Sequence, residues 1–138
     1  MITGFTILSV DAKIDSAEAL PKQRFPRLNI NIDKVSQSGE GMSINYAFIA
    51  EYFDGEGKEA KSVGQIKLMG VADVEDTKPN VAEAVKKWAD NKTLPVKLTE
   101  ELINGLNFRC GATGTLVAYS LGLIPPLVIT TTKVQEQK

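Results

Sequence analysis

The apolar residues of this chain repeat with two different periods, and the change between them falls near the middle of the sequence. Up to about residue 74 they alternate with polar residues, which predicts β-strands. From about residue 80 they recur every three or four positions, which predicts helices. Strands that come first and helices that come last indicate an α+β domain. We therefore expect four strands followed by two helices.

The four predicted strands are arranged for hairpin pairing. They cover residues 2–14, a segment that opens at Phe25-Pro26, residues 42–53 and residues 63–74. Asp54-Gly55-Glu56-Gly57 is a hairpin signal between the last two. Such links favour an antiparallel sheet with the helices on one face. The expected fold is a four-stranded antiparallel sheet with two helices packed on one face.

Two glycines interrupt the apolar face of the fourth predicted strand. Gly64 and Gly70 share the parity of Ile66 and Leu68, so they leave gaps on that face. Glycine within a strand indicates either a bulge or a close approach by another group.

Both predicted helices have start and stop signals. Asn80 and Glu83 have the spacing of a capping box at the start of the first helix, which ends before Leu94-Pro95. Thr99 is the expected cap of the second helix, and Gly122 is its expected C-terminal end. The second helix also carries a face of small residues, which predicts close packing against another helix or the sheet: Gly111, Ala112, Gly114 and Ala118.

The composition excludes several classes of function. The 138 residues fit one domain, residues 1–138, and a net charge of −1 favours neither nucleic acid nor an anionic membrane. No histidine is present, which removes Ser-His and Cys-His catalysis and the commonest zinc ligand. A single cysteine, Cys110, suits a reducing compartment. No apolar stretch approaches a membrane span, so we expect a cytoplasmic protein that does not insert into membranes.

No motif predicts a catalytic residue, a cofactor or a metal site. Cys110-Gly111-Ala112-Thr113-Gly114 resembles a dinucleotide-binding turn, but the preceding residues are predicted to be helical instead of a strand. Cys110 without a nearby histidine is better explained as a buried structural thiol. The acidic residues Asp73, Glu75 and Asp76 lack the spacing of a calcium loop.

The chain has more large apolar residues than a small core can absorb. Tyr52 and Phe53 are adjacent in a predicted strand, so their side chains must point to opposite faces and only one of them can enter the core. The same holds for the adjacent apolar residues Leu123 and Ile124 beside the prolines. Surplus apolar surface of this kind usually marks an interface.

The order and spacing of several short motifs resemble the SecB family of export chaperones and related SecB-like proteins. Leu106-Asn107-Phe108 and the later Gly122, Pro125 and Leu127 are similar to the family's helix and its exit. Phe25-Pro26 and the alternating residues that follow resemble the end of the family's crossover loop and its next strand. Gly70 falls where the family's fourth strand carries glycine. Family members are typically strongly acidic, whereas this chain is nearly neutral.

The resemblance implies a site and an assembly. SecB-like proteins form dimers that pair into tetramers, and they hold unfolded polypeptides in apolar grooves between the crossover loop and the helices. Carried over by position, the implied client-binding residues are Phe25, Leu28, Leu116, Leu121 and Ile124.

Three functions remain open from the sequence. The leading hypothesis is an ATP-independent holdase chaperone or SecB-like adaptor in protein export or transport, which binds unfolded or extended clients and possibly a SecA-type translocase. The alternative is a dedicated interaction module for one partner, such as an antitoxin or an assembly subunit. A small enzyme that works without histidine is the third.

Overall fold

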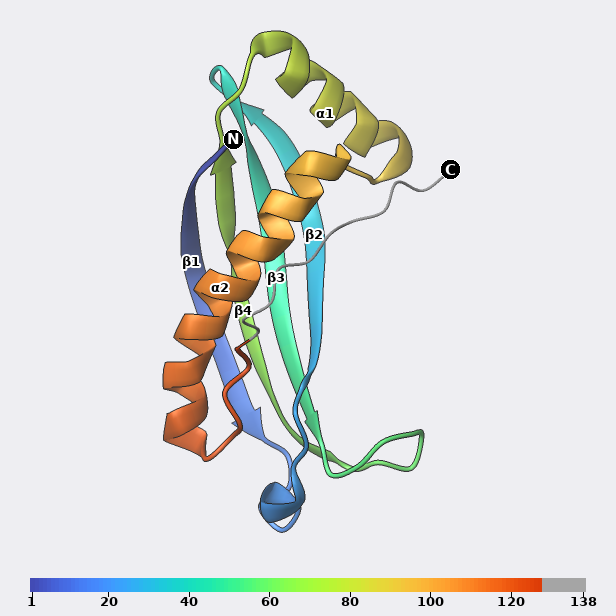
Figure 1. The fold of residues 1–138 in the computed structure, drawn as a ribbon, viewed down its shortest axis with the longest axis vertical. Coiled ribbons are helices and arrows are strands. Elements are labelled where there is room, and N and C mark those ends of the chain that lie inside the picture. Colours follow the sequence, from blue (N-terminus) through green and yellow to red (C-terminus); the bar gives the residue numbers. More distant parts are fainter. Residues whose placement is uncertain (128–138) are drawn as a thin grey trace.

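The computed structural model describes residues 1–127, and residues 128–138 lie outside the described part (Figure 1). Four strands are followed by two helices, in the order expected. One turn of 3-10 helix, Leu20–Lys22, lies between the first two strands. The main elements are β1 (Ile2–Ile14), β2 (Arg27–Ser38), β3 (Gly41–Phe53), β4 (Ser62–Val74), α1 (Lys78–Asn91) and α2 (Val96–Leu121).

The strands form one antiparallel sheet in the order β1-β4-β3-β2. β1 and β2 follow each other in the chain but form the two opposite edges, so residues 15–26 cross from one edge to the other. α1 and α2 lie on the same face of the sheet (Figure 1). α1 packs on β2 and β3, whereas α2 packs on β1 and β4. The expected α+β fold with helices on one face is therefore confirmed.

A bulge in β1 explains why its apolar residues change parity. Phe5 and Ile7 pack against the core from odd positions, whereas Ala12 and Ile14 do so from even positions. The pairing with β4 shifts register at Leu8, and one extra residue in a strand turns the following side chains to the other face. Leu8 itself is exposed.

The edge strand β2 contains a similar bulge. Its pairing with β3 shifts register between Ile32 and Lys34. Ile32 before the shift and Val35 after it both pack against the core, although their positions differ in parity. Both edges of the sheet are therefore interrupted within the strand.

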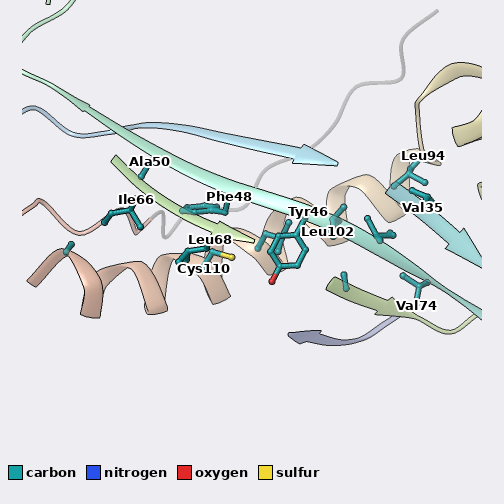
Figure 2. Packing of buried hydrophobic residues seen from close by; sticks show 14 of the residues in the cluster. Val35, Tyr46, Phe48, Ala50, Ile66, Leu68, Val74, Leu94, Leu102 and Cys110 are labelled. Atoms are coloured by element: carbon teal, nitrogen blue, oxygen red, sulfur yellow. The ribbon is translucent and has the colours of Figure 1, made fainter. Parts of the chain in front are cut away.

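The core lies between the sheet and the helices (Figure 2). Tyr46, Phe48 and Leu68 from the central strands are fully buried, as are Leu102 and Cys110 from α2. Burying one Leu or Phe side chain stabilises a fold by about 1.5–3 kcal/mol, so this cluster dominates the stability. On the opposite sheet face, Phe53 is only half-buried, and the Arg27 guanidinium lies 4.2 Å from its ring centroid.

The gap at Gly70 is filled by a tyrosine ring. A Cβ atom at position 70 would lie 2.6 Å from the Tyr46 hydroxyl oxygen and would also clash with the Thr6 carbonyl oxygen of β1. The Tyr46 hydroxyl in turn donates a hydrogen bond to that carbonyl at 3.3 Å. Of the two possibilities left open by the sequence, Gly70 serves close approach.

The helix starts differ from those predicted. α1 begins after Thr77, three residues before the expected cap, because Pro79 lies in its first turn, where proline's missing N–H costs nothing. Asn80 is inside the helix and its side-chain amide donates to Asp76 Oδ1 at 2.9 Å. α2 begins after Pro95, and the Thr99 hydroxyl donates to the Pro95 carbonyl oxygen at 3.0 Å. The predicted C-cap Gly122 is confirmed, with a φ of 74°.

Residues 1–127 contain two α-helices, α1 and α2. Neither helix is both long enough and apolar enough to cross a bilayer.

Candidate functional site

Large apolar side chains remain exposed after the core has formed. This is the surplus that the sequence predicted, and it includes two of the five phenylalanines. The most exposed of these side chains, beyond the first residue, belong to Leu8, Val10, Phe25, Phe108, Leu116 and Tyr119.

An apolar groove runs between β2 and the first half of α2, and we call it the β2 groove. It has a volume of about 450 Å³. Its sheet wall consists of the half-buried side chains of alternate β2 residues. Its helix wall consists of residues spaced three to four apart. The lining residues are Leu28, Ile30, Ile32, Thr99, Leu102, Ile103 and Asn107.

A second depression, the Phe25 hollow, opens three residues before the sheet wall of the β2 groove begins. Phe25 and Ile124 line it together with residues 21–24 and Asp54, and its volume is about 630 Å³. Phe25 is 54% exposed, so its ring is available to a partner.

Hydrogen bonds hold the Ile124 backbone at this hollow. The Ile124 N–H donates to Gln23 Oε1 at 2.7 Å, and the Gln23 amide donates to the Gly122 carbonyl oxygen at 2.8 Å. The Tyr52 hydroxyl, whose pKa is raised by burial, donates to the Ile124 carbonyl oxygen at 2.6 Å. Ile124 is therefore fixed from the crossover segment and from β3 at once.

The segment Leu123–Leu127, here called the exit segment, packs on α2. Pro126 and Leu127 lie so close to Gly114 and Gly111 that a Cβ atom would meet them at 2.8 and 2.9 Å. The small-residue face of α2 thus packs against the chain's own exit, not against another helix or the sheet as expected. Ala112 does not belong to this contact and is exposed.

An exposed apolar row follows the side of α2 that points away from the sheet. Phe108, Ala112, Leu116 and Tyr119 recur at spacings of four, four and three, which places them on one face of the helix. Phe108, Leu116 and Tyr119 are each more than 70% exposed. We call this row the α2 stripe.

The residues implied by the sequence resemblance fall on different parts of this surface. Phe25 and Ile124 share one hollow, and Leu28 lies in the β2 groove. Leu116 lies on the α2 stripe, whereas Leu121 is half-buried against the core. The sequence reasoning did not include Ile30, Ile32 and Ile103 in the site. Ile30 and Ile32 share the parity of Leu28, which was the available signal.

Cys110 has no features of a nucleophile. Its side chain is fully buried, and burial raises the pKa of the thiol to about 11. The Tyr46 hydroxyl that contacts it also has a raised pKa, chiefly because it is buried. The predicted structural role of this cysteine is confirmed.

We expect Cys110 to react very slowly with a thiol reagent in the folded protein. A pKa about two units above that of a free cysteine leaves about a hundredfold less thiolate at pH 8, and burial slows access further. The measurement is the rate of colour release from Ellman's reagent with and without denaturant. Fast native labelling would contradict the buried assignment.

The acidic residues at the end of β4 are explained by local hydrogen bonds. Asp76 Oδ1 accepts from the Thr77 N–H at 2.7 Å and from the Asn80 amide, and these bonds lower the pKa of Asp76. Within residues 1–127, no three potential ligands among Asp, Glu and Cys are grouped as a metal would require.

Comparison with known proteins gives a likeness of fold alone. No protein-family model matches the sequence, and no curated protein is similar to it in sequence. The structure is similar to that of the Mycobacterium tuberculosis SecB-like chaperone Rv1957, which was solved in complex with a ChAD peptide from the Rv1956 HigA1 antitoxin. The TM-score is 0.53 at 12% sequence identity, with 100% of this chain and 91% of the chaperone chain covered. The fold thus matches that of a SecB-like protein, and this neighbour is a chaperone, not an enzyme.

Proposed function

We propose that this protein binds unfolded or extended polypeptide as an ATP-independent holdase chaperone or SecB-like adaptor. The observation that carries the proposal is the β2 groove, which is lined by five aliphatic residues, together with the hollow at which the Phe25 ring is exposed. Thr99 and Asn107 are the polar residues that line the groove, whereas the hollow is lined by Lys22, Gln23, Arg24 and Asp54 beside Phe25 and Ile124. The implied client-binding residues Phe25, Leu28 and Ile124 belong to this surface.

The size and chemistry of this surface suit an extended chain. Each apolar client side chain that leaves water contributes about 1.5–3 kcal/mol, and three or four such contacts offset the cost of ordering a short segment. Such binding is reversible and tolerant of sequence, as a holdase requires.

The SecB-like neighbour supports the same class of function, because it was solved with a peptide bound. That peptide comes from an antitoxin, which also favours our second candidate, a dedicated adaptor for one partner. A role in export with a SecA-type translocase is the remaining variant. These variants share the binding surface and differ in the range of clients.

The α2 stripe is the surface that we assign to self-association. Leu116 lies on it, and no described residue covers it. A homodimer or homotetramer would bury the stripe and so remove its apolar surface from water. We include in the proposal that residues 1–138 form one cytoplasmic domain without enzymatic activity.

The test is a delay of client aggregation without nucleotide. We expect the pure protein to suppress light scattering by chemically denatured citrate synthase at about equimolar ratio, and ATP to make no difference. Several unrelated denatured clients distinguish the general chaperone from the dedicated adaptor, because a dedicated adaptor would protect none of them. No protection of any client, together with no binding of an unfolded peptide, would refute the chaperone assignment.

A further inference from the structure

We propose that the surface around Phe25 prefers client segments in which an acidic residue stands next to the apolar residue that the Phe25 hollow binds. The acidic side chain lies between the guanidinium groups of Arg24 and Arg27. This assignment rests on the function proposed above, and it names the class of polypeptide that the same surface takes most readily.

A further depression, which we call the arginine recess, shares Phe25 with the hollow. It has a volume of about 460 Å³. Its lining residues are Arg24, Phe25, Arg27, Phe53, Gly55 and Glu56. Phe25 and Arg24 line both depressions, and the Arg24 N–H donates to the Phe53 carbonyl oxygen at 2.9 Å, which ties the crossover to the end of β3. A client residue that covers the exposed Phe25 ring therefore brings its neighbours to the recess.

The Arg27 guanidinium is held in place by the Phe53 ring. Its central carbon lies over the ring, 4.2 Å from the centroid. An aromatic face attracts a cation but does not replace a carboxylate as a hydrogen-bond acceptor, so the guanidinium N–H donors keep their capacity for a ligand. Glu51 is the cross-strand partner of Arg27 in β3, yet the ion pairs within residues 1–127 do not include these two side chains. Arg27 is thus ordered and still has donors to offer.

Each depression carries one more cation than carboxylate. The hollow has Lys22 and Arg24 against Asp54. The recess has Arg24 and Arg27 against Glu56. The chain as a whole has a net charge of −1, so the excess of cations around Phe25 is opposite in sign to the charge of the molecule. A positive surface beside an exposed apolar ring is complementary to a ligand that carries an apolar group and a negative charge side by side.

The carboxylates near these cations leave them available. Asp54 Oδ1 accepts a hydrogen bond from the Lys61 N–H at 2.8 Å, within the loop between β3 and β4. Among residues 1–127, no carboxylate forms an ion pair with Lys22, Arg24 or Arg27. Arginine binds a carboxylate through two parallel charge-assisted hydrogen bonds, which a neutral amide does not reproduce. The guanidinium groups therefore favour a carboxylate that the client supplies.

The preferred client segment is an aromatic or large aliphatic residue with glutamate or aspartate at a neighbouring position. Neighbouring side chains of an extended chain point to opposite sides, so the apolar side chain enters the hollow while the acidic one turns to the recess. We expect a preference of about fivefold over the uncharged segment at low ionic strength, because exposed ion pairs are weak and are screened by salt.

Fluorescence anisotropy of labelled peptides with the full chain tests the preference. Two peptides with blocked ends contain one phenylalanine, flanked on both sides by glutamate in the first and by glutamine in the second. We expect the glutamate peptide to bind about fivefold more tightly at low salt, and the difference to disappear at high salt. In the double variant Arg24→Gln with Arg27→Gln, the two peptides should bind equally at any salt concentration.

The matched control removes two cations elsewhere. Lys78 and Lys86 are exposed on α1 and line neither depression, so Lys78→Gln with Lys86→Gln should keep the full preference for the glutamate peptide. Arg24 and Arg27 are exposed as well, so both double variants should fold as the parent does, which urea unfolding checks.

The outcomes separate this preference from the binding function. Equal binding of both peptides by the unaltered chain would overturn the acidic preference while the binding function stands. A preference that persists without the two arginines, or that the α1 control also loses, would overturn the assignment to the recess. Tightest binding of a third peptide, which ends in a free carboxylate directly after its phenylalanine, would assign the recess to a chain terminus instead. If no peptide binds, the preference and the binding function both fail.

Discussion

Replacement of Phe25 by aspartate should weaken the binding of an unfolded client by about thirty- to a hundredfold. The ring is 54% exposed and lies over the hollow that it shares with Ile124. Loss of its burial against the client removes about 1.5–3 kcal/mol, and a carboxylate placed against an apolar segment adds a desolvation cost. Fluorescence anisotropy of a labelled unfolded peptide measures the affinity, and the delay of client aggregation should shorten in parallel.

Phe108→Asp is the matched control, since it makes the same change at a phenylalanine that is 73% exposed on the α2 stripe. We expect client affinity to remain within about twofold and the mass in solution to fall, because this residue belongs to the proposed self-association surface. Both side chains are exposed, so both variants should unfold within about 0.5 kcal/mol of the parent. Equal loss of client binding in the two variants would refute the assignment of the hollow.

Gly114→Leu should cost about 2–3 kcal/mol of stability and should also weaken client binding. Even a Cβ atom at this position would lie 2.8 Å from the Pro126 ring, so a leucine forces the exit segment away from α2. The exit segment carries Ile124 into the Phe25 hollow, and its displacement breaks the hydrogen bond from Tyr52. Urea unfolding measures the free energy, and peptide anisotropy measures the affinity.

Ala112→Leu provides the comparison for that variant. It adds the same side chain two residues earlier, on the exposed face of the helix, where nothing in residues 1–127 packs tightly against it. Its stability should stay within about 0.5 kcal/mol of the parent. If Gly114→Leu were as stable as Ala112→Leu, the close packing of the exit segment would be wrong.

The apolar periodicity was sufficient to predict the strands, the helices and their order along the chain, although not the order of the strands within the sheet. Strand boundaries for β1, β3 and β4 agree within a residue, because each strand has an apolar face and flanking turn residues. The predicted start of α1 was wrong. Asn80 and Glu83 have the spacing of a capping box, but Pro79 lies in the first turn of the helix, which begins at Lys78. Several residues near a helix start can serve as its N-cap, and their spacing in the sequence does not show which of them does so.

Less of the candidate site could be predicted. The glycines of α2 indicated close packing, but the sequence did not indicate that the packing partner is the exit segment. Likewise, Ile30 and Ile103 are far apart in sequence and line one groove because α2 leaves the β2 side of the sheet uncovered. Periodicity identifies the apolar face of each element, whereas a groove depends on the space that remains between two elements after they have packed.

The bulges in β1 and β2 have a consequence for the proposed binding of unfolded chains. Each outer strand offers an incoming chain only a short stretch of regular hydrogen-bonding groups before the register is broken at Leu8 or between Ile32 and Lys34. Ordered stacking of strands into fibrils requires a long, flat and uninterrupted template. Neither outer strand of the described sheet offers such a template along its whole length.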